Sequence, residues 1–427
     1  MKKGFTLIEL LAVIVVLAII ATITTPIVLN IVNNGKKSTY QSSIDLYGKS
    51  VKQAVLNYEL DKKVTPKTFE QIKSYLEFEG NKVECSTKII YDDGEIYLKD
   101  CSVDGNLVED YSYGKATLSD TILKHATENK YYYTTKPDFT KAPEDGEYGL
   151  YVAAEDEDNL IYSYYFRGDV ENNYVKFGSY QTGESLTLKD QFEITFEEET
   201  PMYWRIVRVN GDGTVRLIYD GIEKISNGTP HTAIIGESSY NDNDNATMGY
   251  TFGAEDNQVD SVIKVKIEEW YSLYLEKKYE MYIADTIFCN DKSTVEDNLY
   301  SAYSRLNNSN SNPDPTLACS KNDSYTVEND IGNNNLNKPV GLLTADEAFL
   351  AGTGQNSYIY SGKSFWTLTP AEDEQHVYII NPVENIFLDS KAIIDETDNV
   401  RPVINLNIDV RFTGTGTIDD PYVIVTD

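Results

Sequence analysis

Residues 1–30 read MKKGFTLIELLAVIVVLAIIATITTPIVLN and form the most informative stretch of the chain. The run from Phe5 to Leu29 is nearly all apolar, and as a helix it is long enough to cross a bilayer core of about 30 Å. Glu9 is the one acid within this run. Lys2 and Lys3 precede the run, which predicts a cytoplasmic N-terminus with the rest of the chain outside the membrane.

This stretch resembles the N-terminus of type IV pilins and pseudopilins, whose precursors carry a short basic leader, a glycine, then Phe-Thr-Leu-Ile-Glu and a hydrophobic helix. The resemblance implies that residues 1–4 are a leader, that prepilin peptidase cleaves between Gly4 and Phe5, and that Phe5 is then N-methylated. It also implies that Glu9 forms an assembly salt bridge with the N-terminal nitrogen of a neighbouring subunit. An unpaired carboxylate at membrane depth costs several kcal/mol, so Glu9 requires a cationic partner of this kind.

Two other interpretations of the N-terminal stretch compete with this one. In an ordinary signal anchor, Glu9 would sit near the lipid headgroups and have no role. A secretory signal peptide fits poorly, because its apolar core usually spans about 7–15 residues and is followed by the cleavage site. In this chain the expected cleavage site precedes the apolar run.

Composition limits what the rest of the chain can do. The chain has 427 residues, 41% of them hydrophobic, which predicts folded structure in more than one domain. Its 68 acids outnumber 37 bases and give a formal charge of −31. Because phosphate contacts need Lys and Arg, direct nucleic-acid binding by the body of the protein is not expected.

The helical pattern continues beyond the apolar run. Pro26 lacks an N–H and predicts a kink in the helix. Apolar residues then recur at steps of three and four, which predicts one pilin-type helix over residues 5–60 with its inner part, 5–29, in the membrane or filament core. The residues of this stripe are Ile31, Tyr40, Ile44, Tyr47, Val51, Val55 and Tyr58.

Residues 61–118 predict a small pilin head. Thr65 followed by Pro66 predicts the start of a short helix that ends near Leu76. Two strand-like runs flank the turn at 91–95 and predict a hairpin in which paired residue numbers sum to 186.

The four cysteines fall into two local pairs. Cys85 and Cys101 fit the hairpin sum of 186, so we expect them to face each other and form a disulfide. Cys289 and Cys319 form the second expected pair, and an exported location permits both bonds. Reduced, buried thiols are the alternative for all four.

Beyond an expected linker at 119–130, the chain changes character, and residues 131–427 predict a larger, mostly β surface module. Asn210-Gly211-Asp212-Gly213 predicts a hairpin turn, the pattern over 262–282 predicts a helix, and Thr344 with Glu347 predicts a helix start with a capping box. The predicted fold class is therefore α+β. The segments YYFRG, NNYVKF, YWRIVRVNGDGTVRLIYDG, GLLTADEAFLAG, FWTLTP and RPVINL resemble a module of large surface proteins of Gram-positive bacteria. The last two are also similar to segments of the C-type-lectin or formylglycine-generating-enzyme fold.

Catalytic residues are not evident in this module. His125, His231 and His376 are the only histidines, and none belongs to a recognisable catalytic or metal-binding motif, so we expect no enzymatic activity. Three arginines flank the predicted hairpin, and we expect them to face solvent, with a ligand surface as the alternative. They are Arg205, Arg208 and Arg216.

Two acidic loops alternate oxygen ligands of the kind that Ca²⁺ accepts, around Asp156 and Asp158 and around Asp242 and Asp244. Neither has the Gly and Glu positions of an EF-hand. We therefore expect solvated loops and no cofactor, with calcium as the alternative.

The predicted function is that of a structural subunit, a major or large minor pilin, of a type IV pilus-like surface filament. The expected partners are other pilin subunits, prepilin peptidase, the pilus assembly platform and the membrane before assembly. The second module would be displayed for adhesion at the cell surface. Two alternatives remain: a pseudopilin of a type II secretion-like or DNA-uptake machine, and a membrane-tethered receptor or enzyme.

Overall fold

A computed structural model describes most of the chain and divides it into two compact units, with the boundary between Ala116 and Thr117. Both helices and many strands are present, so the α+β class is confirmed. The described residues are 36, 39–90, 94–108, 113–114, 116–156, 161–189, 192–242, 260–295, 299–307, 313–328, 331–352, 354–373, 375–381, 388–392 and 396–426.

The expected membrane segment, 5–29, lies outside the described residues, as do Gly4, Phe5, Glu9 and Pro26. Within the part of the chain that the structure does describe, no helix is both long and apolar enough to cross a bilayer.

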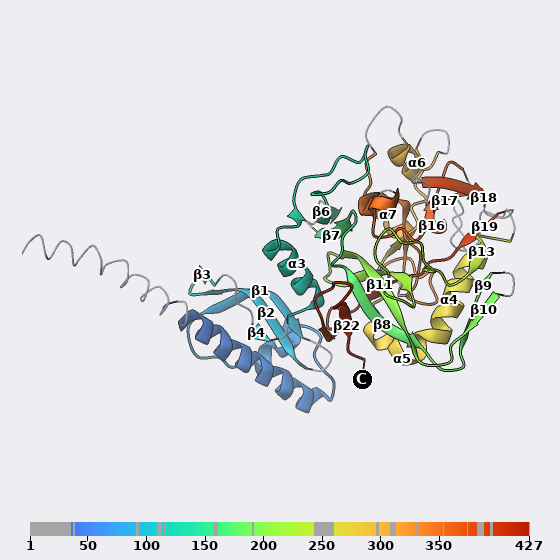
Figure 1. The fold of residues 1–427 in the computed structure, drawn as a ribbon. Coiled ribbons are helices and arrows are strands. Elements are labelled where there is room, and N and C mark those ends of the chain that lie inside the picture. Colours follow the sequence, from blue (N-terminus) through green and yellow to red (C-terminus); the bar gives the residue numbers. More distant parts are fainter. Residues whose placement is uncertain are drawn as a thin grey trace, which may run out of the picture. The chain divides into compact units, whose positions relative to one another are not determined.

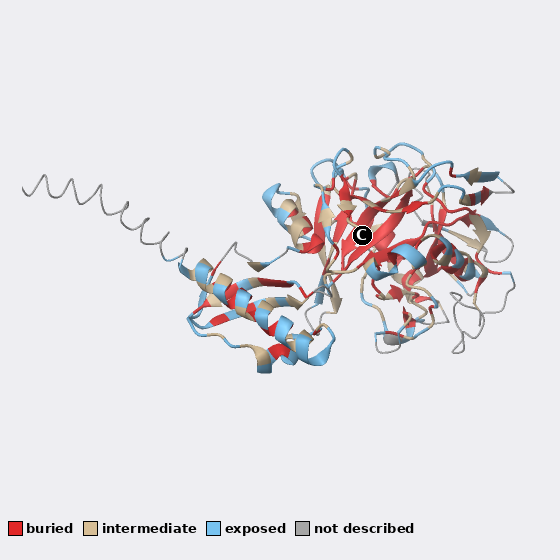
Figure 2. Ribbon diagram, turned by 90° about the horizontal axis from the view of Figure 1, so that it is seen from below, coloured by how far each residue is buried: buried red, intermediate tan, exposed pale blue. Residues whose placement is uncertain are grey.

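The first unit is built on a helix over 39–62 that packs against a small antiparallel sheet (Figure 1). Figure 2 shows buried residues along one side of this helix and exposed residues along the other. The amphipathic stripe is thus confirmed in the described part of the helix, while Ile31 lies outside it. Of the stripe, Ile44, Tyr47, Val51 and Val55 are buried and Tyr40 and Tyr58 are partly buried, and Ala54 is buried on the same face.

The sheet of the first unit is the expected hairpin with two short additions. Cys85 pairs with Cys101, and Ile90 pairs with Ile96, which confirms the predicted sum of 186. The cysteines form a disulfide with a Cα–Cα distance of 3.9 Å. The strands are β1 (Val83–Ile90), β2 (Ile96–Val103), β3 (Asn106–Leu107) and β4 (Tyr113–Gly114), with the last two both paired to β2.

The short helix before this hairpin begins later than expected. Helix α2 (Phe69–Ile72), followed by η1 (Lys73–Tyr75), has Thr68 as its N-cap, so the predicted start at Thr65 is wrong. Thr68 has Gln71 three residues later and forms a capping box with it, whereas Thr65 has no acid or amide at that spacing. The Thr65 hydroxyl instead donates to Glu59 Oε1 at 2.7 Å.

The second unit opens with a helix where a linker was expected. Residues 119–130 lie largely within α3 (Leu118–Glu128), whose N-cap Thr117 accepts a hydrogen bond from the Asp120 N–H. Leu118, Ile122 and Ala126 recur at helical spacing and are buried in the main core of the second unit. The linker prediction is therefore wrong, because this apolar spacing forms an amphipathic helix that packs on the core.

Two sheets form the framework of the second unit in its described residues. The larger, nine-stranded sheet has the order β21-β22-β8-β11-β7-β6-β5, with β12 joined to both β11 and β20. Its strands are β5 (Tyr132–Tyr133), β6 (Gly149–Asp156), β7 (Ile161–Arg167), β8 (Tyr174–Tyr180), β11 (Thr200–Val209), β12 (Val215–Gly221), β20 (Val403–Leu406), β21 (Phe412–Thr413) and β22 (Tyr422–Ile424).

The smaller, five-stranded sheet has the order β13-β19-β16-β17-β18, and two separate two-stranded pairs, β9 with β10 and β14 with β15, accompany it. The strands are β9 (Ser185–Lys189), β10 (Phe192–Thr195), β13 (Glu237–Ser239), β14 (Phe288–Cys289), β15 (Ser324–Tyr325), β16 (Phe365–Pro370), β17 (His376–Ile380), β18 (Leu388–Ala392) and β19 (Thr397–Asn399).

The predicted hairpin at 210–213 is confirmed and joins β11 to β12. The Asn210 N–H bonds to the Thr214 carbonyl oxygen at 2.9 Å. Gly213 adopts a φ of 88°, a left-handed conformation that glycine accommodates without steric cost. Arg208 and Arg216 pair with each other across the two strands, next to this turn.

The helix expected over 262–282 forms in pieces. It is interrupted near Leu275 and continues as short segments, while the predicted capping box of Thr344 and Glu347 is confirmed at the start of α7. The helices are α4 (Val262–Tyr274), α5 (Glu276–Tyr279), η2 (Glu280–Tyr282), α6 (Ser301–Leu306), η4 (Lys321–Asp323), α7 (Ala345–Ala351) and η5 (Gly354–Asn356).

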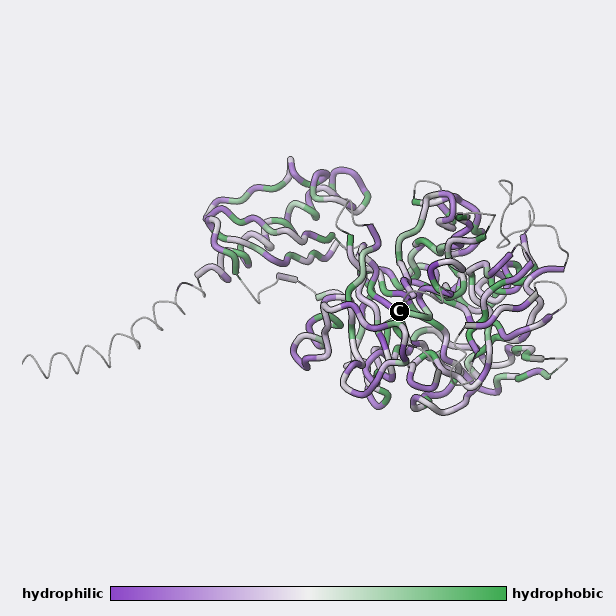
Figure 3. Tube along the Cα trace, turned by 90° about the horizontal axis from the view of Figure 1, so that it is seen from above, coloured by the Kyte–Doolittle hydropathy of each residue, from purple (hydrophilic) through white to green (hydrophobic). Residues whose placement is uncertain are grey.

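The core of the second unit lies between its strands and helices. Trp204 and Trp366 are fully buried there, and α4 contributes Ile263, Ile267 and Trp270 to the same core. Hydrophobic and hydrophilic stretches alternate along the chain in both units (Figure 3). Such alternation is expected for strands and helices that bury one face and expose the other.

Candidate functional site: a charged cavity in the second unit

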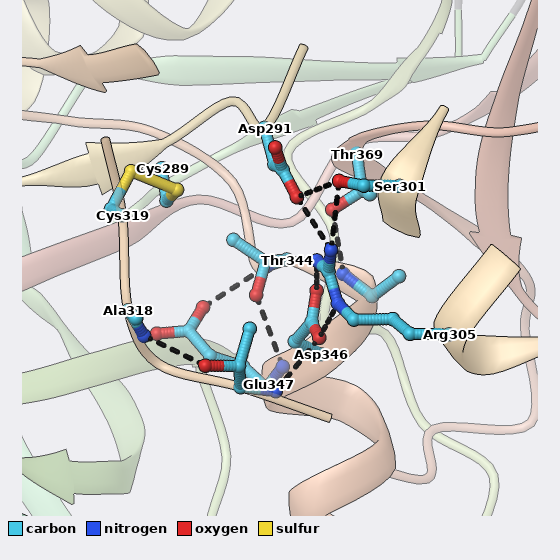
Figure 4. Close-up of polar contacts among 12 residues, drawn as sticks. Cys289, Asp291, Ser301, Arg305, Ala318, Cys319, Thr344, Asp346, Glu347 and Thr369 are labelled. Carbon is cyan, nitrogen blue, oxygen red and sulfur yellow. Dashed lines mark hydrogen bonds and ion pairs between the residues drawn. A yellow bond between two sulfur atoms is a disulfide. The ribbon is translucent and has the colours of Figure 1, made fainter. Parts of the chain in front are cut away.

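A cavity of about 370 Å³ lies within the second unit, beside the start of α7 and the turn after β11. Its volume is within the range of small-ligand pockets, roughly 300–1,000 Å³. Figure 4 shows part of its wall, including the start of α7, Arg305 and a disulfide. The charged residues among the described lining are Glu155, Asp156, Arg208, Asp212, Arg216, Asp291, Arg305, Asp346 and Glu347.

Glu347 lies at the centre of the first buried charge network. Its Oε1 is 2.6 Å from Arg216 Nε and 3.1 Å from Arg208 Nε, and Arg208 also pairs with Glu155 through Nη1. The side chains of Arg216 and Glu347 are only 1% and 3% exposed. The expectation that these arginines face solvent is therefore wrong, because α7 supplies a buried anion that the strand pattern alone does not reveal.

The third hairpin arginine, Arg205, is also buried but lies outside the cavity lining. Its Nε donates to Asn173 Oδ1 at 2.8 Å, and its guanidinium lies 3.7 Å from the centre of the Tyr174 ring. These contacts hold neighbouring parts of the fold together, so the alternative of a ligand surface made by all three arginines is not supported.

Glu347 has a second role at the start of α7. Its Oε2 accepts the Thr344 N–H and its own N–H donates to the Thr344 hydroxyl oxygen, both at 3.0 Å. Burial by itself would raise the pKa of Glu347, but the charges of Arg216 and Arg208 outweigh it and hold that pKa below its ordinary value. Glu347 is therefore an anion that is fully engaged by the protein itself.

Arg305 forms the second network, shown in Figure 4. Its Nη2 lies 2.6 Å from Asp346 Oδ2 and its Nε 2.9 Å from Asp346 Oδ1, a bidentate pair. Its Nη1 lies 2.6 Å from Asp291 Oδ2. Burial would raise the pKa of Asp291, but the Arg305 charge and hydrogen bonds from Ser293 lower it overall.

Two further contacts hold the wall made by residues 316–319. Asp346 Oδ1 accepts the Thr316 N–H at 2.9 Å. Cys289 and Cys319, both in the lining, form the second disulfide with a Cα–Cα distance of 5.8 Å. Both disulfides expected from the sequence are thus present in the structure, and this one joins two segments of the cavity wall.

Two lining residues carry buried oxygens without a hydrogen-bond partner among the described residues. Thr286 is 8% exposed and its Oγ1 has no partner. Asn210 is 6% exposed, and its Oδ1 has no partner, although its Nδ2 donates to Thr214 Oγ1 at 2.8 Å and to Asn405 Oδ1 at 3.0 Å. The Thr286 hydroxyl can both donate and accept, whereas the Asn210 amide oxygen only accepts. Arg216 Nε, also in the lining, makes an ion pair with Glu347 Oε1 at 2.6 Å but no hydrogen bond of good geometry.

The three histidines lie outside the described lining of the cavity. His231 Nε2 is 3.1 Å from Asp220 Oδ1, and its Nδ1 is 2.9 Å from the Thr229 carbonyl oxygen. His125 contacts the Tyr422 hydroxyl and His376 contacts Asp373. These ring nitrogens thus contact carboxylates, a carbonyl oxygen and a tyrosine hydroxyl.

The calcium candidates are only partly described. Asp156 lines the cavity and Asp242 lies at the end of a described segment, while Asp158 and Asp244 lie outside the described residues. Among the residues that the structure does describe, no group of three or more His, Cys, Asp or Glu side chains is arranged to hold a metal ion.

Comparison with known proteins places the N-terminus in a defined class. Residues 1–25 match the family model described as the prokaryotic N-terminal methylation motif. The chain carries the class III signal of type IV pilins and pseudopilins. The matched residues include Gly4, Phe5 and Glu9, and the motif indicates a pilin-like or pseudopilin-like secreted subunit that interacts with other pilin subunits and a prepilin peptidase.

No curated protein and no solved structure matches the chain. The likeness of the second unit to Gram-positive surface modules and to the C-type-lectin fold therefore stays a prediction.

Proposed function

We propose that this protein is a structural subunit of a type IV pilus-like surface filament, a major or large minor pilin. The N-terminal methylation motif over residues 1–25 is the observation that carries the proposal. In this role the leader ends at Gly4, prepilin peptidase exposes Phe5 as the new N-terminus, and Phe5 is N-methylated.

Glu9 is the proposed assembly residue. Before assembly it lies within an apolar segment, where an ionised carboxylate is costly unless it is paired. The nitrogen of Phe5 in a neighbouring subunit would neutralise it and fix the axial offset between subunits. Pairing of this kind favours one register over others more than it adds raw stability.

The described part of the first unit is consistent with a pilin head. The helix over 39–62 buries one face against the stapled hairpin. In this proposal the apolar residues 5–29 that precede it enter the membrane and then the filament core. We propose that the second unit, Thr117–Asp427, is displayed on the filament for adhesion, without a catalytic role.

Immunogold electron microscopy of native surface filaments, with antibodies against the second unit, tests the proposal. Filaments labelled along the shaft would indicate a major pilin and label at the tip a minor one. Glu9→Ala should abolish incorporation while leaving the chain in the membrane, and Glu77→Ala, at an exposed position in the head, serves as the matched control.

Unlabelled filaments, with the chain confined to the membrane, would reject the pilin proposal and favour a membrane-tethered receptor. A pseudopilin shares the motif over residues 1–25 and is the alternative within the same class. Label confined to short assemblies at a secretion or DNA-uptake machine would favour it.

A further inference from the structure

We propose that Lys264 and Asn337 become joined by an intramolecular isopeptide bond, with Glu268 as the base. The bond links Lys264 Nζ to the side-chain carbon Cγ of Asn337. This modification goes beyond the proposed role in a filament and does not depend on it, because all three residues belong to the second unit.

Lys264 is buried, which is rare for a lysine. It lies in the first turn of α4, is 1% exposed, and is the one buried lysine among the residues that the structure describes. Lysines are almost never fully buried unless they are paired. Lys264 Nζ lies 2.7 Å from Asp260 Oδ1 and 3.1 Å from Glu268 Oε2.

The side-chain amide of Asn337 contacts the same two carboxylates. Its Nδ2 donates to Glu268 Oε2 at 2.9 Å and to Asp260 Oδ2 at 3.1 Å. The backbone N–H of Asn337 also donates to Glu268 Oε1 at 2.8 Å, so this residue is held at two points. Lys264 Nζ and Asn337 Nδ2 therefore contact one and the same carboxylate oxygen.

Charge pairing by itself does not require this arrangement. The Asp260 side chain is 37% exposed and already offers Lys264 a carboxylate that keeps part of its hydration. The Glu268 side chain is only 8% exposed, so placing it beside Lys264 adds a second buried charge at a desolvation cost. An amine, a carboxamide and a buried base that contacts both are the groups that an amide exchange needs.

The exchange needs no outside reagent. Lys264 Nζ gives one proton to Glu268 Oε2 and attacks Cγ of Asn337 as a neutral amine. The Cγ–Nδ2 bond breaks, Nδ2 takes the proton from Glu268, and ammonia leaves. Nζ releases its second proton to Glu268. The new Nζ–Cγ bond thus replaces the Cγ–Nδ2 bond, and Glu268 ends as a neutral acid.

The folded chain favours this reaction in two ways. It holds the amine and the amide against one base, which converts a bimolecular reaction into a unimolecular one. The product also replaces a buried ammonium and a buried carboxylate by neutral groups, which removes the cost of keeping them out of water. Asn337 lies at an exposed position, so the ammonia can escape to solvent.

Peptide mapping of the full chain by mass spectrometry tests the inference. The chain is denatured, reduced and digested with trypsin, which does not cut after an acylated lysine. We expect Lys264 to stay uncut and joined to the peptide that contains Asn337, at a combined mass that is lower by one ammonia. The intact, reduced chain should show the same deficit against the mass calculated for its N-terminus.

Two variants with matched controls identify the reacting groups. Glu268→Gln keeps the shape of the side chain but removes the base, so the bond should be lost. Glu269→Gln changes an exposed neighbour on α4 and should leave the bond intact. Lys264→Arg keeps the buried positive charge without the amine and should stay unlinked, whereas Lys277→Arg, at an exposed position, should be linked.

The inference is overturned if the parent chain yields a free peptide that ends at Lys264, with no deficit in the intact mass. This outcome does not depend on how well any variant folds. A Glu268→Gln chain that is linked as fully as the parent would show that Glu268 is not the base. A deficit of one water, with Lys264 joined to Asp260, would also reject Asn337 as the partner.

Glu9→Ala should carry the bond as the parent chain does, because Glu9 lies outside the second unit. Failure of the bond and failure of filament assembly are therefore distinguishable.

Discussion

Arg216 Nε lies 2.6 Å from Glu347 Oε1 at a place where the two side chains are 1% and 3% exposed. The same carboxylate oxygen also contacts Arg208, and the other oxygen of Glu347 caps helix α7. One side chain thus neutralises two buried cations from the β11–β12 hairpin and fixes the start of a helix. This link joins two interior strands of the sheet to a helix that lies far away in the sequence.

Glu347→Gln should destabilise the second unit by about 3–5 kcal/mol, because two buried guanidinium groups lose their shared anion. The capping box should survive, since Gln71 fills the same position in the capping box of α2. Urea unfolding followed by tryptophan fluorescence measures this, because Trp204, Trp270 and Trp366 are the only tryptophans and all lie in the second unit.

Glu197→Gln removes an exposed acid of the same unit and is the matched control. If both variants unfolded at the same urea concentration, the Glu347 network would not contribute to stability.

Acid should destabilise the second unit through its paired carboxylates. Burial would raise the pKa of Asp220, but the His231 hydrogen bond and the Arg401 charge lower it below the ordinary 3.8. The pKa values of Glu347 and Asp291 are also lowered, by their arginine partners against the effect of burial. A carboxylate whose pKa is lower in the folded chain than in the unfolded chain stabilises the fold at any pH above its unfolded-state pKa. That stabilisation is lost as the pH falls through its folded-state pKa.

The urea midpoint, followed from pH 7 to pH 3, should therefore stay nearly constant down to about pH 5 and fall below about pH 4. Asp220→Asn should lower the midpoint at pH 7 and show a smaller further loss in acid. A midpoint that does not change down to pH 3 would contradict this account.

Loss of the Cys289–Cys319 disulfide, by changing both residues to Ser, should cost the second unit about 3 kcal/mol or somewhat more, because the unfolded chain gains freedom. The matched variant changes Cys85 and Cys101 to Ser. It should leave the tryptophan transition in place, because that bond belongs to the first unit.

Intact mass under non-reducing conditions provides the direct check. The untreated chain should be lighter than the reduced chain by about four hydrogen atoms, since each disulfide forms with loss of two. A mass equal to that of the reduced chain would mean that neither bond forms in the cell.

Gly4→Val should block removal of the leader, and the chain should accumulate as the longer precursor. Intact mass and N-terminal sequencing measure this. Lys3→Arg keeps the charge of the leader and should be processed normally. A correctly trimmed product from Gly4→Val would show that cleavage does not depend on Gly4.

Local patterns were sufficient for several elements. The hairpin register followed from a short turn and alternating strands, because each pairing is fixed by its neighbours once the turn is set. The capping box of Thr344 and Glu347 could also be predicted, because its two residues are only three positions apart. The predicted helix start at Thr65 was wrong because Thr68 and Gln71, one turn later, form a capping box.

The candidate site could not be predicted in the same way. Arg208 and Arg216 lie on strands that read as half-exposed, and their anion, Glu347, comes from a helix well beyond them in the chain. Arg305 and Asp346 likewise meet only because α6 and α7 approach each other. Nothing in the spacing of these residues indicates the pairing.

The sequence by itself determined the N-terminal class III signal, the α+β class and both cysteine pairs. Each of these features depends on residues that are close in the sequence, on overall composition, or on a strand register that is set by a single turn. Only the tertiary structure decided that the hairpin arginines are buried and that a cavity opens beside them. Burial of a charge depends on whether a distant residue supplies the opposite charge, and that is known only after the chain has folded.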